Sequence, residues 1–137
     1  MTTNKPETQG AHHIGLTVPD LNVAKSFYVD TLGFNILGEV PDYPAVFVSD
    51  GNTMITLWQA VDPDNTVAFD RKNVIGLHHL AFKVDGDEAL SRLHDKLQGT
   101  NGVEIEFAPT GLGAGPTQHF MISMPGGIRI EFISPAA

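Results

Sequence analysis

The sequence predicts an α+β fold made of two similar modules, each with the element order β-α-β-β-β. Three observations support this prediction. A histidine doublet inside an apolar, strand-like segment occurs at residues 12–18 and again at 78–84, with the histidines 66 residues apart. An acidic residue and a helical pattern follow each copy. Three short strand-like runs then complete each half.

In the first half, Asp20 is a suitable N-cap for a helix, and Gly33 is a suitable stop. Apolar residues between them recur every three or four positions, as on one face of a helix. They are Leu21, Ala24, Phe27, Tyr28 and Leu32. Strands are predicted at residues 35–40, 45–49 and 53–59.

The second half repeats this order. The acidic residues 85–87 open a helix with Leu90, Leu93 and Leu97 on one face, and Gly99 lies beyond its end. Strands are predicted at residues 102–107, 117–124 and 127–134.

These elements define a single domain over residues 11–137. A polar, proline-bearing segment separates its two modules and is predicted to be a linker. The ranges are a loose N-terminus at 1–10, module 1 at 11–60, the linker at 61–75 and module 2 at 76–135.

Alternation along the strands predicts which side chains face the helices. The helix-facing set is apolar: Ile14, Leu16, Val18, Leu80, Phe82 and Val84 in the opening strands, and Ile55, Leu57, Ile130 and Phe132 in the closing strands. His13 and His79 have the opposite parity and are predicted to face a pocket, as do Thr56 and Glu131. Met54 and Trp58 lie beside Thr56, whereas His12 and His78 are predicted on the helix side.

Composition narrows the classes of partner. Eight basic residues against sixteen acidic ones give a net charge of −8, which repels phosphate backbones and anionic membranes, so neither is an expected partner. The polar first ten residues and the lack of a long apolar run predict a cytoplasmic protein. The chain has no cysteine, so any metal is held by nitrogen and oxygen.

The pocket-facing residues suit a metal site. In two repeats related by an approximate two-fold, His13 and His79 form one equivalent pair and Thr56 and Glu131 another. Two imidazoles and one carboxylate with open coordination positions suit Fe²⁺, Mn²⁺ or another borderline divalent ion. The alternative is a decayed site that holds only water.

The stretches "HHIGLTVPDL", "FYVDTLGF", "LHHLAFKV" and "PGGIRIEFI" resemble the vicinal oxygen chelate superfamily over residues 11–135. That superfamily includes glyoxalase I, methylmalonyl-CoA epimerase, extradiol dioxygenases, fosfomycin-resistance transferases and bleomycin-binding proteins. The resemblance implies a curved, mostly antiparallel, cup-shaped sheet with helices outside. It also implies metal ligands at His13, His79 and Glu131, and a homodimer.

The family's remaining ligand position falls on Thr56, where glyoxalase-like and epimerase-like members carry glutamate or glutamine. Threonine is no general base at neutral pH, so this departure disfavours a lyase or isomerase. The remaining ligand set resembles that of extradiol dioxygenases. That chemistry needs an acid or base outside the ligand set, for which His119 is the candidate, although a histidine at a loop end is at least as commonly a surface residue.

Two further readings stay open. Fosfomycin-type transfer needs a cluster of cations, and only Lys83 and Arg129 are candidates. A non-catalytic antibiotic-binding protein would stack a cationic ligand on Trp58 and Phe47.

We therefore expect a metal-dependent, dioxygenase-like enzyme acting on a small oxygenated, catecholic substrate, ahead of a lyase or isomerase. Fe²⁺ or Mn²⁺ is favoured, with Ni²⁺, Co²⁺ or Zn²⁺ as alternatives. The expected catalytic residues are Glu131 and His119, and the substrate-binding residues are Thr56, Trp58, Met54, Phe47 and Arg129.

Overall fold

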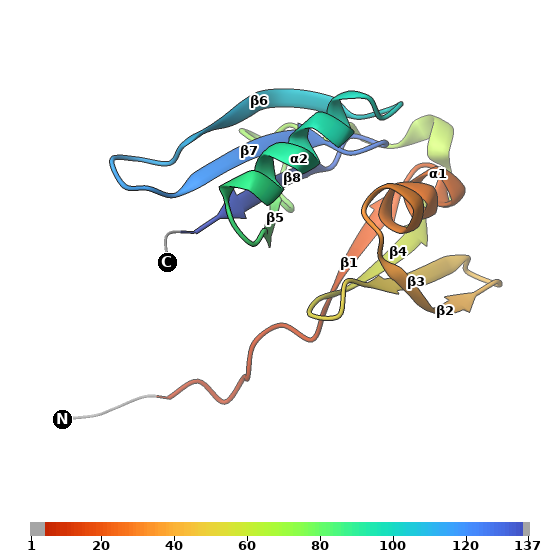
Figure 1. The fold of residues 1–137 in the computed structure, drawn as a ribbon. Helices are drawn as coiled ribbons and strands as arrows, with labels where there is room; N and C mark the ends of the chain where they lie inside the picture. Colours follow the sequence, from red (N-terminus) through yellow and green to blue (C-terminus); the bar gives the residue numbers. More distant parts are fainter. Residues whose placement is uncertain (1–4, 136–137) are drawn as a thin grey trace. The chain divides into compact units, whose positions relative to one another are not determined.

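A computed structural model of the chain describes residues 5–135 (Figure 1). The chain divides into two compact units after Pro63, within the predicted linker. Each unit contains one four-stranded sheet, and the element order β-α-β-β-β occurs twice, as predicted. Of the predicted loose N-terminus, residues 1–4 lie outside the described residues, and residues 5–10 are exposed and form neither helix nor strand. No helix within residues 5–135 is long and apolar enough to cross a bilayer.

The first unit has the strand order β1-β4-β3-β2. Its first strand runs parallel to β4, and the other neighbours are antiparallel. Its elements are β1 (His13–Val18), α1 (Leu21–Ser26), η1 (Phe27–Thr31), β2 (Asn35–Val40), β3 (Ala45–Ser49) and β4 (Met54–Gln59).

The predicted first helix is helical throughout, but its second part is a π-helix. Asp20 caps the start, because its Oδ1 accepts a hydrogen bond from the Val23 N–H at 3.2 Å. From Phe27 the turn widens, and the Leu32 N–H donates to the Phe27 carbonyl, five residues back. The wider turn accommodates two adjacent aromatic side chains, Phe27 and Tyr28, which are both buried.

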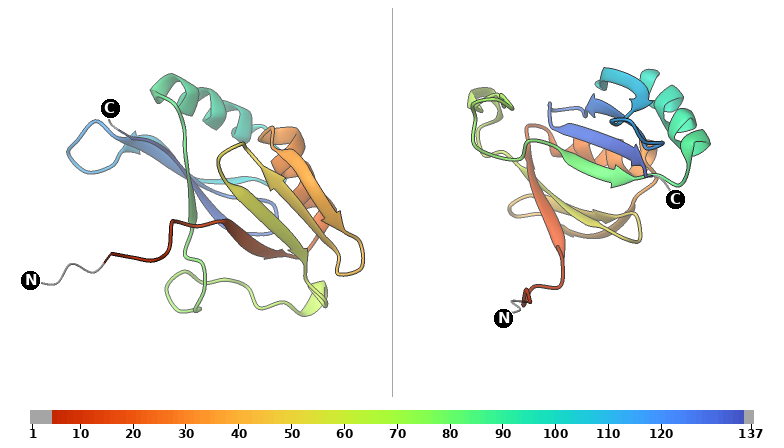
Figure 2. Two further views of the ribbon diagram at one scale, coloured as in Figure 1. Left: turned by 90° about the horizontal axis from the view of Figure 1, so that it is seen from below. Right: turned by 90° about the vertical axis from the view of Figure 1, so that its left-hand side faces the viewer.

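The second unit repeats the topology with the strand order β5-β8-β7-β6, and α2 packs on β6, β7 and β8 (Figure 2). The short helix η2 (Pro63–Asn65) spans the boundary between the units. The other elements are β5 (Leu80–Lys83), α2 (Asp87–Gln98), β6 (Glu104–Gly111), β7 (Gln118–Ser123) and β8 (Arg129–Ser134).

Two predicted strands of this unit have the wrong extent. The predicted strand 78–84 is shorter, because β5 starts at Leu80 and the His78 carbonyl accepts a hydrogen bond from the Arg129 side chain. The predicted strand 102–107 instead runs from Glu104 to Gly111, with two shifts of register against β7. It continues through Pro109 because β6 is an edge strand, where a missing N–H is tolerated.

The predicted helix-facing residues form the core of each unit. Leu16, Ile55 and Leu57 are buried in the first, and Leu80, Ile130, Phe132 and Phe82 in the second. Ile14 and Val84, at strand ends, are half-buried. Burial alternates with a period of two in β1 and β5, whereas in β4 and β8 the intervening Thr56 and Glu131 are buried as well.

One polar residue in this core is poorly satisfied. His94 of α2 is 8% exposed and packs edge-on against Phe120, with ring centroids 5.3 Å apart. Within residues 5–135, its Nε2 atom has no hydrogen-bond partner. We expect His94→Leu to raise the free energy of unfolding by about 1–2 kcal/mol, because a buried unpaired polar atom carries a penalty of that order. Urea denaturation measures this change, with His94→Gln as the polar control; a lower midpoint for His94→Leu would contradict the prediction.

Candidate functional site

The strand registers show that Thr56 and Glu131 occupy equivalent positions in the two units. Gly15 of β1 pairs with Thr56 of β4, and Ala81 of β5 pairs with Glu131 of β8. Gly15 and Ala81 are separated by the same 66 residues as the histidine doublets, so they are equivalent in the repeat. Their partners, Thr56 and Glu131, are therefore equivalent too. A carboxylate therefore stands in the second unit where the first has a hydroxyl.

In the first unit, the structure brings three predicted residues together. Thr56 is 3% exposed, and its Oγ1 accepts a hydrogen bond from the Trp58 Nε1–H at 2.8 Å. The indole lies against Phe47, with ring centroids 5.8 Å apart, and edge-on against Tyr43 at 4.6 Å. The sequence analysis missed Tyr43, which precedes β3 outside any periodic pattern.

His13 and Met54 lie opposite each other at the start of the β1–β4 ladder. His13 is exposed, and its Nδ1 is 2.9 Å from the Nδ1 of His12.

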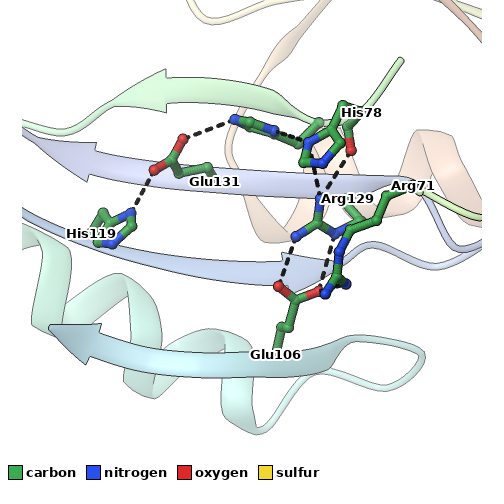
Figure 3. Close-up of polar contacts among 7 residues, drawn as sticks. Arg71, His78, Glu106, His119, Arg129 and Glu131 are labelled. Atoms are coloured by element: carbon green, nitrogen blue, oxygen red, sulfur yellow. Dashed lines mark hydrogen bonds and ion pairs between the residues drawn. The ribbon is translucent and has the colours of Figure 1, made fainter. Parts of the chain in front are cut away.

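In the second unit, Glu131 lies between two histidines (Figure 3). One carboxylate oxygen, Oε1, is 3.2 Å from His79 Nε2, and the other, Oε2, is 2.5 Å from His119 Nδ1. The side chains of Glu131 and His119 are each 12% exposed, and that of His79 is 34% exposed. The predicted acid or base, His119, is thus in direct contact with the predicted ligand, and its ring packs edge-on against Phe107.

A second set of contacts extends from His79 to the edge of the sheet. The Nδ1 atoms of His79 and His78 are 2.8 Å apart. Arg129 places its Nη1 atom 3.3 Å from His78 Nδ1 and 3.1 Å from the His78 carbonyl oxygen. On its other side, Arg129 donates to the Glu106 carboxylate through Nε at 3.0 Å and Nη2 at 2.7 Å. Arg71 Nη1 also donates to Glu106 Oε1, at 3.4 Å.

These contacts differ from the sequence predictions for two residues. His78 precedes β5, so strand parity does not place it on the helix side, and its ring contacts His79 and Arg129. Arg129 is paired with a carboxylate and its side chain is only 10% exposed, so its charge is not free to hold a phosphonate. Lys83 is exposed. The sequence carried no signal for Glu106 as the partner, because register shifts in β6 determine where its side chain lies.

The hydrogen bonds from Arg129 hold the pKa of Glu106 below its usual value of 4.5, with the charges of Arg129, Arg71 and His78 acting in the same direction against partial desolvation. Since the pKa is lower in the folded state, this carboxylate stabilises the fold above the unfolded pKa, and the contribution is lost as pH falls through the folded pKa. We therefore expect a shallower loss of stability below about pH 4.5 in Glu106→Gln than in the wild type. Urea midpoints across pH 3–6 measure the two slopes; parallel slopes would contradict the expectation.

An arginine only donates, so Arg129 Nη1 donates to His78 Nδ1 only when that atom carries no proton. Which of the facing Nδ1 atoms of His78 and His79 donates in their contact depends on the tautomers of the two rings. His79 Nε2 faces Glu131 Oε1 at 3.2 Å, a separation that fits a hydrogen bond when one of the two atoms carries a proton.

The separation of these two atoms also suits a shared metal ion. Two donors about 2.1 Å from an ion and at a right angle to each other are about 3.0 Å apart, close to the 3.2 Å between His79 Nε2 and Glu131 Oε1. Each has an outer partner of the kind that orients metal ligands, His78 and His119. Within the described residues, no group of three or more His, Asp or Glu side chains is arranged to hold a metal. The second unit therefore supplies two donors.

Comparisons with known proteins agree with the fold. The profile of the Glyoxalase/Bleomycin resistance protein/Dioxygenase superfamily matches residues 10–132. The solved glyoxylase/bleomycin resistance protein/dioxygenase domain from Frankia sp. EAN1pec superposes with a TM-score of 0.80 at 24% identity, covering 95% of this chain and all of that one.

Relatives by sequence carry different names. The uncharacterized protein YwkD of Bacillus subtilis is 34% identical over 101 residues, which are 69% of this chain and 73% of that one. Mitochondrial methylmalonyl-CoA epimerase of Mus musculus is 37% identical over 84 residues, 57% of this chain and 47% of the epimerase. Catechol-2,3-dioxygenase of Bacillus subtilis is 29% identical over 117 residues, 71% of this chain and 41% of the dioxygenase. The chain thus spans less than half of either enzyme.

Proposed function

Because the chain belongs to the Glyoxalase/Bleomycin resistance protein/Dioxygenase superfamily, we propose that it is a divalent-metal-dependent enzyme acting on a small oxygenated substrate. The observation that carries the proposal is the His79–Glu131 pair, whose ligand atoms face each other at 3.2 Å with an outer partner behind each. A divalent ion bound there would take the place of the proton that otherwise joins the two atoms.

His79 and Glu131 would hold the ion, and the resemblance assigns a third ligand to His13. Nitrogen and oxygen donors with open positions favour Fe²⁺ or Mn²⁺, while Ni²⁺, Co²⁺ and Zn²⁺ accept the same donor types. When bound, such an ion polarises a substrate oxygen and lowers the pKa of a coordinated water.

The remaining roles belong to the chain's own side chains. His119 would orient Glu131 through the contact of its Nδ1 with Oε2, and its other ring nitrogen would hold or release a proton beside a substrate. Thr56, which accepts from Trp58, contributes a hydroxyl and no carboxylate. One acid or base on the second unit's side suits a reaction that needs a single proton transfer, so we place catecholic dioxygenase chemistry first.

A lyase or isomerase of the epimerase type is the second candidate, supported by the 37% identity to methylmalonyl-CoA epimerase. It would need a base that replaces the family's glutamate at Thr56. A third candidate is a non-catalytic protein that binds a cationic ligand, favoured by the aromatic cluster of Trp58, Phe47 and the exposed Tyr43.

Elemental analysis of untagged protein purified without oxygen tests the proposal. Near-stoichiometric iron or manganese, with dioxygen uptake on a panel of catechols, is the expected result. Nickel, cobalt or zinc with turnover of a 2-methyl-branched acyl thioester would favour the isomerase. No metal after reconstitution, in a folded protein, would overturn the enzyme proposal and leave the binding protein.

A homodimer is part of the proposal, on the resemblance alone. Light scattering coupled to gel filtration should give twice the 14.8 kDa chain mass. A monomer that binds metal and turns over substrate would contradict the dimer and leave the enzyme proposal standing.

A further inference from the structure

Trp58 of β4 is held in place by two neighbouring residues. Its Nε1–H donates to the Oγ1 atom of Thr56 at 2.8 Å. Gly15 of β1 pairs with Thr56, and a Cβ atom at position 15 would lie 3.2 Å from that Oγ1 and 3.5 Å from the indole Nε1. The indole can therefore lie beside β1 and reach Thr56 because position 15 has no side chain.

The second unit has a different arrangement at the equivalent positions. The strand registers relate Gly15, Thr56 and Trp58 to Ala81, Glu131 and Ile133. A methyl group, a carboxylate and an aliphatic side chain thus stand where the first unit has an open position, a hydroxyl and an indole. The first unit presents an anchored aromatic ring at the place where the second presents a metal donor.

The indole of Trp58 belongs to an aromatic cluster that solvent reaches. Phe47 lies tilted against it and Tyr43 lies edge-on. Trp58 and Phe47 are half-buried, and Tyr43 is 56% exposed. Aromatic rings attract one another in offset-stacked and edge-to-face arrangements, so a bound aromatic ring can extend the cluster.

The Thr56 hydroxyl still has a hydrogen to donate. Its oxygen accepts from Trp58, and within residues 5–135 no acceptor takes its own hydrogen. Thr56 is 3% exposed, and a buried donor without an acceptor carries a penalty that an acceptor oxygen of a bound molecule would remove. Gly15, directly beside Thr56, is exposed, so the hydroxyl borders space that a bound molecule can enter.

We propose that the first unit binds an aromatic ring that carries an acceptor oxygen, with the ring against Trp58 and the oxygen accepting from Thr56. Gly15 is a positioning residue, since it leaves room for the other two. The inference deepens the proposed function and rests on it only in taking the bound molecule to be the substrate. The site offers a hydrogen-bond donor and its four side chains, with Phe47 and Tyr43, include no carboxylate, so it suits an acceptor better than an ammonium group.

Titration of the full chain with catechol under nitrogen, before and after a chelator removes metal, tests the proposal. Trp58 is the only tryptophan among the 137 residues, so one indole N–H signal in ¹H–¹⁵N spectra reports on it. We expect catechol to move this signal along a saturable curve with and without metal. Cyclohexane-1,2-diol, which has vicinal oxygens and no aromatic ring, should move it far less.

Variants of Thr56 test the role of its hydroxyl. Thr56→Val preserves the shape of the side chain and should weaken catechol binding about 2–10-fold, the loss expected for one hydrogen bond. Thr56→Ser keeps the hydroxyl and should bind catechol nearly as well as the wild type. Rescue by serine separates the hydrogen bond from a packing role.

Gly15→Ala tests the positioning role. The new methyl group would force the Thr56 Oγ1 atom away, so the indole signal should move in the ligand-free protein and catechol should bind more weakly. Gly38→Ala is the matched control in the same sheet, because a Cβ atom there meets only the Phe47 ring, at an ordinary 3.9 Å. It should change neither readout. If Gly15→Ala does not fold, the Thr56 variants still test the site.

The outcomes separate this inference from the proposed function. No saturable shift of the indole signal with catechol, in a folded protein, would overturn the inference whether or not the chain binds metal. A shift with tetramethylammonium and none with catechol would overturn it in favour of a cationic ligand. Unchanged catechol affinity in Thr56→Val would overturn the role of the hydroxyl. Catechol binding at Trp58 in a chain that takes up no metal would support the inference and overturn the proposed enzyme.

Discussion

Glu131→Ala and His79→Ala are each expected to lower the affinity for a divalent metal by more than about 100-fold, beyond the loss expected for an outer partner. The reason is that each removes one of the two donors that face each other at 3.2 Å. Catalytic turnover should be lost with the metal. Isothermal titration with Mn²⁺ and elemental analysis of the purified variants measure the loss.

Glu131→Gln provides a finer comparison, because it preserves the shape of the side chain and removes its charge. It should also bind metal weakly, since a neutral amide is a poor substitute for a carboxylate ligand. Glu104→Gln, on an exposed position of β6, is the control. Full metal content in Glu131→Ala would show that the ion, if bound, lies elsewhere.

Phe120→Ala is expected to lower the free energy of unfolding by about 3–5 kcal/mol. The side chain is fully buried, and its ring lies between those of His94, at 5.3 Å, and Phe132, at 5.2 Å. Removing it leaves a cavity between α2 and β8 that the packed sheet fills only partly. Urea denaturation followed by circular dichroism measures the change.

Ile75→Ala is the matched control for Phe120→Ala, because its side chain is fully exposed and its removal leaves no cavity. We expect its midpoint to stay near that of the wild type. A loss below about 1 kcal/mol in Phe120→Ala would mean that the core beneath α2 is loosely packed.

Local patterns predicted the elements well where neighbours in sequence determine the structure. The start of α1 follows from its capping residue Asp20, and the bounds of β2 and β3 follow from short-range periodicity. The acidic residues 85–87 mark the start of α2 at Asp87, although its N-cap is Gly86 and no side chain caps it. The π-helical turn at residues 27–31 was not predictable in this way, because the same spacing of apolar residues also fits an α-helix.

The candidate site was likewise predicted only in part from the sequence. Parity alone placed Thr56 and Glu131 at equivalent positions, and the strand registers agree with it. His119 is a candidate because dioxygenase-like chemistry needs an acid or base outside the ligand set, but its contact with Glu131 depends on the pairing of β7 with β8. The two residues are 12 positions apart, and the turn between their strands has a length that the periodicity of the strands does not determine.

By itself, the sequence determined the repeat, the apolar residues that form the core of each unit, and the histidines and carboxylate of the proposed site. These properties depend on residue identity and on periods of two and 3.6 residues, which are visible along a single chain. Only the tertiary structure decided that Arg129 pairs with Glu106 and binds His78, and that Glu131 lies between His79 and His119. Shifts of register in an edge strand and the direction of one guanidinium determine those contacts, and neither leaves a periodic signal in the sequence.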